Sequence, residues 1–208
     1  MQKSLLLPVV IVLFAAAPCA AQEQSSGTVA LSTLKRDRAF GRQLIQEMEE
    51  HSMAERKAES EFMSTLSGKS TESRAKAMAK FKKKQAAEKK KFRRQMHEKM
   101  ADYQAKKHKE SVSNMRAKLA ENKQMTEDEK ATYMARMETR YKSGKEYNNK
   151  LFEEKEKLLD ALDKPNLDEA QEAALRKEYD VKTRVLQEEY QKKSAEEEEE
   201  FRKKALAE

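Results

Sequence analysis

The side chains best suited to bind a transition metal are three histidines. His97 and His108 are eleven residues apart, a spacing that places them on one face of a helix, and Met96 and Met100 lie near them. The two imidazoles lack the one-turn spacing needed to hold a single ion, and several neighbouring lysines repel cations. The third histidine, His51, is in a separate segment. We therefore expect surface histidines and no metal site, with a metal-binding stress protein as the third functional hypothesis.

Catalytic motifs are missing from the sequence. It contains no P-loop, Gly-rich dinucleotide turn, nucleophile elbow or His-Glu-x-x-His pattern, and its four glycines are too few for most backbone phosphate cradles. Carboxylates are abundant, but on solvated helix faces they lack the burial that tunes a pKa for acid-base catalysis. We predict that the chain is not an enzyme and needs no cofactor.

The N-terminus has the pattern of a cleavable signal peptide over residues 1–21. Lys3 provides the positive charge, Leu5 to Ala17 the apolar run and Pro18 to Ala21 the small-residue exit. The apolar run is shorter than the roughly 20 residues of a membrane-spanning helix, so we expect no transmembrane anchor. Cleavage near Ala21 predicts a protein that is exported to the periplasm or beyond. The mature chain would then lack Cys19, the only cysteine.

Composition predicts an all-α protein. Charged residues make up 39% of the chain and aromatic residues 6%, and only four glycines and three prolines are present. Such a chain favours long amphipathic helices with narrow apolar stripes, and we expect them to form an extended helical hairpin or coiled-coil-like assembly. A flexible leader is expected at 22–32, followed by one elongated helical domain at 33–208.

Three breaks should divide this helical domain, near residues 64–71, 122–126 and 163–167. After the second break, Thr126 and Glu129 have the spacing of a capping box, which predicts a helix beginning at Glu127. After the third, Asn166 with Glu169 is expected to cap the last helix.

Charge is divided unevenly along these helices. Residues 69–118 carry 18 basic and 5 acidic side chains, whereas residues 146–208 carry 13 basic and 19 acidic ones. Phe81, Phe92 and Tyr103 recur every eleven residues within the basic stretch and should share a face. The lysines fit two interpretations, a solvated face packed against the acidic helix or a surface for an anionic partner. The methionines likewise fit either core filling or contact with varied apolar segments.

Two segments resemble the Spy/CpxP family of periplasmic chaperones and stress sensors. Residues 125–130, Met-Thr-Glu-Asp-Glu-Lys, are similar to the family's Leu-Thr-x-x-Gln motif, with Met125 in place of Leu and Glu129 in place of Gln beside Thr126. Residues 157–170 look like the helix, Pro-Asn turn and helix that follow it. The resemblance covers about 125–193.

The resemblance implies an ATP-independent holdase, commonly a dimer, whose basic and apolar surface shields unfolded or envelope proteins. Carried onto this chain, it suggests a client-binding surface formed by Met78, Phe81, Phe92, Met96, Met100 and Tyr103 with Lys82, Lys89 and Arg93.

Two alternatives stay open. Narrow stripes on long charged helices are typical of a structural coiled-coil protein of the cell envelope. The basic arms are also similar to those of the Skp/OmpH chaperones, although only residues 28–31 suggest one of the strands of that family's β-rich body. Basic residues interleaved with aromatics are found in nucleic-acid-binding proteins, but an exported protein rarely meets nucleic acid as its ligand, so we predict none.

Overall fold

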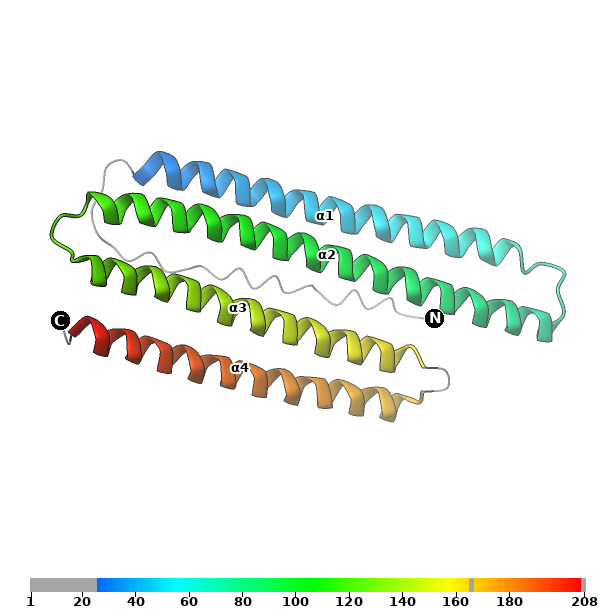
Figure 1. Cartoon of the computed structure of the whole chain (residues 1–208). Helices are drawn as coiled ribbons and strands as arrows, with labels where there is room; N and C mark the ends of the chain where they lie inside the picture. The colour runs from blue at the N-terminus through cyan, green and yellow to red at the C-terminus, as the bar shows by residue number, and fades with distance from the viewer. Residues whose placement is uncertain (1–25, 165–166, 207–208) are drawn as a thin grey trace. The chain divides into compact units, whose positions relative to one another are not determined.

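A computed structural model describes residues 26–164 and 167–206 of the chain. These residues form four long helices and no strand, which confirms the predicted all-α fold (Figure 1). None of the described helices is long and apolar enough to cross a membrane. The chain divides into two units, residues 1–54 and 55–208. The helices are α1 (Ser26–Ser64), α2 (Thr71–Glu121), α3 (Glu127–Leu162) and α4 (Glu169–Leu206).

The start of α1 differs from the prediction. The predicted signal peptide and residues 22–25 lie outside the described residues, but residues 26–32 of the expected leader belong to α1. Ala30 and Leu31 are strong helix formers, so the serines and the glycine before them did not prevent the helix from beginning at Ser26.

The first predicted break lies where α1 ends, and it forms a tight polar turn. Gly68 has a φ of 76°, a left-handed conformation that glycine adopts without strain. Arg74 Nε donates a hydrogen bond to the carbonyl of Leu66 at 3.1 Å, which ties the start of α2 to the turn. Ser70 caps α2 by accepting a hydrogen bond from the Ser73 amide at 3.3 Å.

The other two breaks are closed by reciprocal caps. Thr126 and Glu129 form the predicted capping box, and α3 begins at Glu127 as expected. The cap of α4 is shifted from the prediction, because Asp168 and Gln171 exchange the two bonds at 3.1 and 2.8 Å. Asn166 lies outside the described residues.

Helices α3 and α4 form an antiparallel hairpin (Figure 1). Aromatic side chains contact one another between the two helices. Tyr190 of α4 stacks on Tyr147 of α3 with ring centroids 4.6 Å apart. Eleven residues further along each helix in the antiparallel sense, Phe201 receives the guanidinium of Arg136 over its ring at 4.1 Å. Eleven residues complete just over three helical turns, so the contact recurs on nearly the same faces.

The apolar core of residues 55–208 is thin. Among its described residues, only three hydrophobic side chains are buried, Leu66, Val112 and Leu119. Most aromatic and methionine side chains on α2, α3 and α4 are half-buried. Ring stacking and interhelical ion pairs must therefore carry a large share of the packing.

We expect Gly144→Ala to stabilise the protein by about 1 kcal/mol, because alanine is favoured over glycine in a helix interior. A Cβ at this position of α3 would lie 3.7 Å from the Tyr190 hydroxyl, an ordinary contact. Thermal unfolding followed by circular dichroism measures the change. Gly144→Leu is the matched comparison, since a larger side chain must displace Tyr190 and should destabilise. A loss of stability in the alanine variant would contradict this packing.

Candidate functional site

Helix α2 contacts α3 through its two histidines, which are therefore not the surface histidines that the sequence predicted. His97 stacks on Phe152 with centroids 4.0 Å apart, and His108 stacks on Tyr141 at 3.9 Å. Both pairs are eleven residues apart on their helices, so one register serves both contacts. This shared face, rather than solvent, is where the histidine spacing places the imidazoles.

Each histidine also faces a polar group of α3. His97 Nε2 lies within hydrogen-bond distance of Asn149 Oδ1, at 3.1 Å. His108 Nε2 lies 3.2 Å from Glu138 Oε1, close enough for an ion pair when the ring is protonated, although the two atoms do not form a hydrogen bond. No group of three or more potential metal ligands comes together among the residues described for this chain.

Two ion pairs continue this contact toward the N-terminal end of α2. Arg93 Nε bonds Glu156 Oε1 at 2.5 Å, and Lys90 Nζ bonds Asp160 Oδ2 at 2.5 Å. The side chain of Glu156 is only 8% exposed and that of Arg93 23% exposed, whereas Lys90 and Asp160 are more open. Arg93 Nη2 and Glu156 Oε2 are buried without hydrogen-bond partners, so a single hydrogen bond joins Arg93 to Glu156, which we call the inner pair.

Lys155 adds a further charge beside the inner pair. Burial is the main cause that lowers the pKa of Lys155, and the Arg93 guanidinium lowers it further, while Glu156 acts in the opposite direction. The protonated amine is thus disfavoured in the folded state.

Helix α3 ends soon after the ion pair between Lys90 and Asp160, whereas α2 extends beyond this pair toward its own N-terminus. Asp160 is two residues from the end of α3 at Leu162, and it pairs with Lys90. Because the helices are antiparallel, the part of α2 before Glu88 has no residue of α3 opposite it (Figure 1). At 1.5 Å per residue, the part of α2 that α3 does not cover is about 25 Å long. We call residues 55–87, which comprise the end of α1, the turn and the start of α2, the hairpin tip.

The hairpin tip has an apolar groove beside its turn. Met63 of α1 and Leu66 of the turn face Met78 and Ala75 of α2, and the open groove between them has a volume of about 530 Å³. Met63 is 52% exposed, whereas Leu66 is buried. One turn further along α2, Phe81 stacks on Phe62 of α1 at 4.0 Å, which joins the two helices.

Positive charge surrounds this groove. Residues 55–87 carry nine basic and four acidic side chains, and one of the acidic ones, Glu72, pairs with Lys76 at 2.7 Å. Lys80, Lys82 and Lys83 are exposed, and none has an ion-pair partner within the described ranges. The tip therefore combines an open apolar groove with uncompensated lysines.

The residues suggested as a client surface separate into two groups along α2. Met78, Phe81 and Lys82 lie in the hairpin tip. The others lie after residue 87, on the part of α2 that we call the α2 stem. There Arg93 is bonded to Glu156, and the exposed Lys89 lies 3.8 Å from Glu55. On the stem, the side chains of Phe92, Met96, Met100 and Tyr103 are half-buried.

We did not predict the groove from the sequence, although one signal within the sequence points to it. Met63 and Leu66 come before or within the turn at residues 65–70, and Arg74 and Met78 come after it. Their positions on both sides of a turn containing Gly68 show that they must come close together. The family-motif residues Thr126 and Glu129 act as a helix cap, and Met125 beside them is half-buried.

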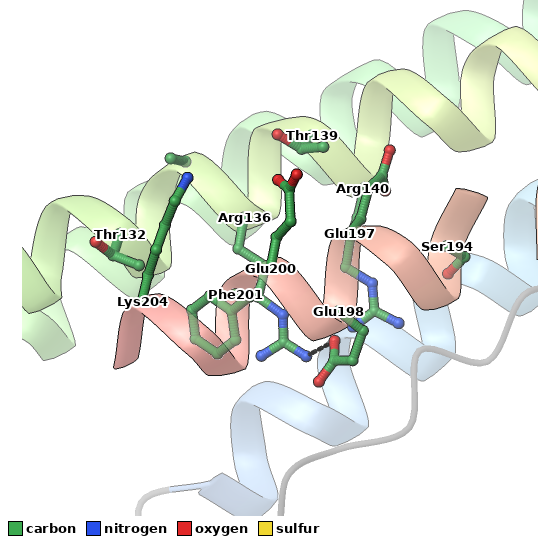
Figure 2. A pocket seen from close by; sticks show the side chains of 11 residues that line it. Thr132, Arg136, Thr139, Arg140, Ser194, Glu197, Glu198, Glu200, Phe201 and Lys204 are labelled. Carbon is green, nitrogen blue, oxygen red and sulfur yellow. Dashed lines mark hydrogen bonds and ion pairs between the residues drawn. The ribbon is translucent and has the colours of Figure 1, made fainter. Parts of the chain in front are cut away.

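A second cavity, of about 140 Å³, lies between α3 and α4 (Figure 2). Arg136 reaches across it to bond Glu198, and Ser143 nearby donates to Glu197 at 2.6 Å. Arg202 also lies 3.7 Å from Glu198. These charges compensate one another across the hairpin, so we assign the cavity to the α3–α4 interface.

Comparison with known proteins does not assign a family. No protein-family model, curated protein or solved structure matches the chain. The resemblance to the Spy/CpxP family therefore stays a prediction.

Glu156→Ala should destabilise the protein by about 3 kcal/mol, because it leaves the Arg93 guanidinium in the α2–α3 contact without its counter-charge. Urea unfolding measures this loss. The double variant Arg93→Met, Glu156→Leu should recover most of it, since well-packed apolar side chains replace a half-buried ion pair at little cost. Equal losses in the single and double variants would contradict the role assigned to the pair.

Lys155→Met should raise the melting temperature at pH 7. The folded-state pKa of Lys155 lies below its unfolded value, so at neutral pH the wild type carries a charge that folding disfavours. This penalty fades as pH rises through the folded pKa toward the ordinary value of 10.5. The stability difference should therefore narrow between pH 7 and pH about 10.5. A difference that widened with pH would overturn the assignment.

Proposed function

We propose that this chain is an exported, ATP-independent chaperone that holds unfolded protein segments at the hairpin tip. The observation that carries the proposal is the pairing of the open groove between Met63 and Met78 with uncompensated lysines around it. Thioether side chains are flexible and polarizable, which suits contact with apolar segments of varied shape. The lysines would attract anionic segments over a longer range.

The predicted signal peptide and the resemblance over 125–193 support a periplasmic place of action for this proposal. An unfolded client exposes apolar side chains that a folded protein would bury, and a groove at the end of a long hairpin reaches them without enclosing the client. Release without ATP requires each contact to be weak, as expected for an open groove with one half-exposed methionine.

A second candidate is a structural coiled-coil protein of the cell envelope, and the eleven-residue repeat favours it. His97 with His108, Phe152 with Tyr141 and Tyr190 with Phe201 all follow this spacing. Such a repeat builds long, nearly straight helices that serve as spacers. Sedimentation velocity tests this candidate, because a concentration-independent compact monomer would argue strongly against it.

The chaperone proposal predicts that mature wild-type protein suppresses aggregation of a chemically unfolded client without ATP, near equal molar amounts. Light scattering measures the suppression. Met63→Gln with Met78→Gln keeps side-chain length and helix propensity but makes the groove polar. We expect half-suppression to require roughly tenfold more of this variant, since two partly buried methionine contacts are lost.

The matched control is Val181→Thr with Val185→Thr, which makes two exposed apolar positions of α4 polar. This control should suppress aggregation like wild type, and circular dichroism checks that both variants stay helical. Equal activity of the groove variant and wild type would exclude the hairpin tip as the site. No suppression by wild type, even in excess, would favour the structural candidate.

A further inference from the structure

We propose that the client segments bound at the hairpin tip are acidic, and that Lys82 and Lys83 bind them as Lys90 and Arg93 bind α3. This inference rests on the proposed function, because it names the class of segment that the tip takes. The α2–α3 contact is the model for this binding. It shows that basic residues on one face of α2, which we call the basic stripe, bind carboxylates.

The two lysines lie on the same face of α2 as the residues that α3 covers. Lys83 precedes Lys90 by seven residues, and Lys82 precedes Arg93 by eleven. Both separations bring a helical side chain back to nearly the same face. Basic side chains on this face of α2 therefore continue from the α2–α3 contact into the hairpin tip, where α3 has already ended.

The carboxylates of α3 show what the stripe binds. Glu156 and Asp160 are four residues apart on one face of α3, and they form ion pairs with Arg93 and Lys90, respectively. Lys82 and Lys83, by contrast, are exposed and form no ion pair with any of the described residues. An acidic segment with carboxylates one turn apart would continue the pairing that α3 begins.

Small side chains make this face accessible to a polypeptide. Ala79, Ala86 and Arg93 follow one another at steps of seven residues and therefore lie on the same stripe. The two alanines add only methyl groups beside Lys82 and Lys83. A segment can thus approach the α2 backbone closely while its carboxylates reach the amines. The groove at Met78 lies on the adjacent face, so an acidic segment that also carries leucine gains both contacts.

Fluorescence anisotropy with the full mature chain tests the inference. The probe is a fluorescein-labelled, unstructured 20-residue peptide with glutamates four apart, interleaved with leucine and serine, and a matched peptide carries lysine in place of glutamate. We expect the wild type to prefer the acidic peptide, with affinity falling as salt is raised. Lys82→Gln with Lys83→Gln should weaken acidic-peptide binding about fivefold, as expected for two exposed ion pairs.

The matched control is Lys106→Gln with Lys109→Gln, which removes the same charge from exposed positions of the same helix. This control should bind the acidic peptide within about twofold of wild type, because net charge alone is a weak, screened effect. Equal binding of the two peptides, or equal losses in the tip and control variants, would overturn the inference. Phosphatidylserine vesicles form a third arm, and vesicle binding that needs Lys82 and Lys83 but is unaffected by the acidic peptide would also overturn it.

Failure of this inference can be told apart from failure of the proposed function. A wild type that suppresses aggregation yet binds both peptides equally keeps the chaperone proposal and removes the acidic preference. A wild type that prefers the acidic peptide through Lys82 and Lys83 yet suppresses no aggregation keeps the inference and removes the chaperone proposal.

Discussion

The packing of residues 55–208 depends on side chains that return to the same helix face every eleven residues. A straight α-helix completes just over three turns in that distance, so a contact made once can be made again without supercoiling the helices strongly. His97 and His108 on Phe152 and Tyr141 follow this rule between α2 and α3. Tyr190 and Phe201 follow it between α3 and α4. The repeat thereby compensates for a thin core.

The same register decides which charges are neutralised. It brings Arg93 to Glu156 and Lys90 to Asp160, and then α3 ends. The basic stripe of α2 continues beyond this point and gives the hairpin tip its excess of lysine. The length of α3 therefore separates the part of α2 that packs against another helix from the part that we propose as a binding surface, because the residue types are similar on both sides of the end of α3.

Several features were predictable because they depend on local chemistry. The capping box at Thr126 and Glu129 and the turn around Gly68 follow from backbone hydrogen bonds and allowed φ values within a few residues. The all-α fold follows from the shortage of Gly and Pro. The cap of α4 was misplaced, because Asn166 and Asp168 both suit a helix start and only Gln171 completes the reciprocal bonds.

The sequence by itself determined the helices, their breaks and the eleven-residue spacing, since each arises from interactions between near neighbours in the chain. It left open whether each basic, aromatic or methionine residue packs against another helix or faces a partner. Only the tertiary structure decided this, because the answer depends on where the partner helix ends. It placed His97, His108 and Arg93 within the α2–α3 contact and left Met78, Lys82 and Lys83 beyond it.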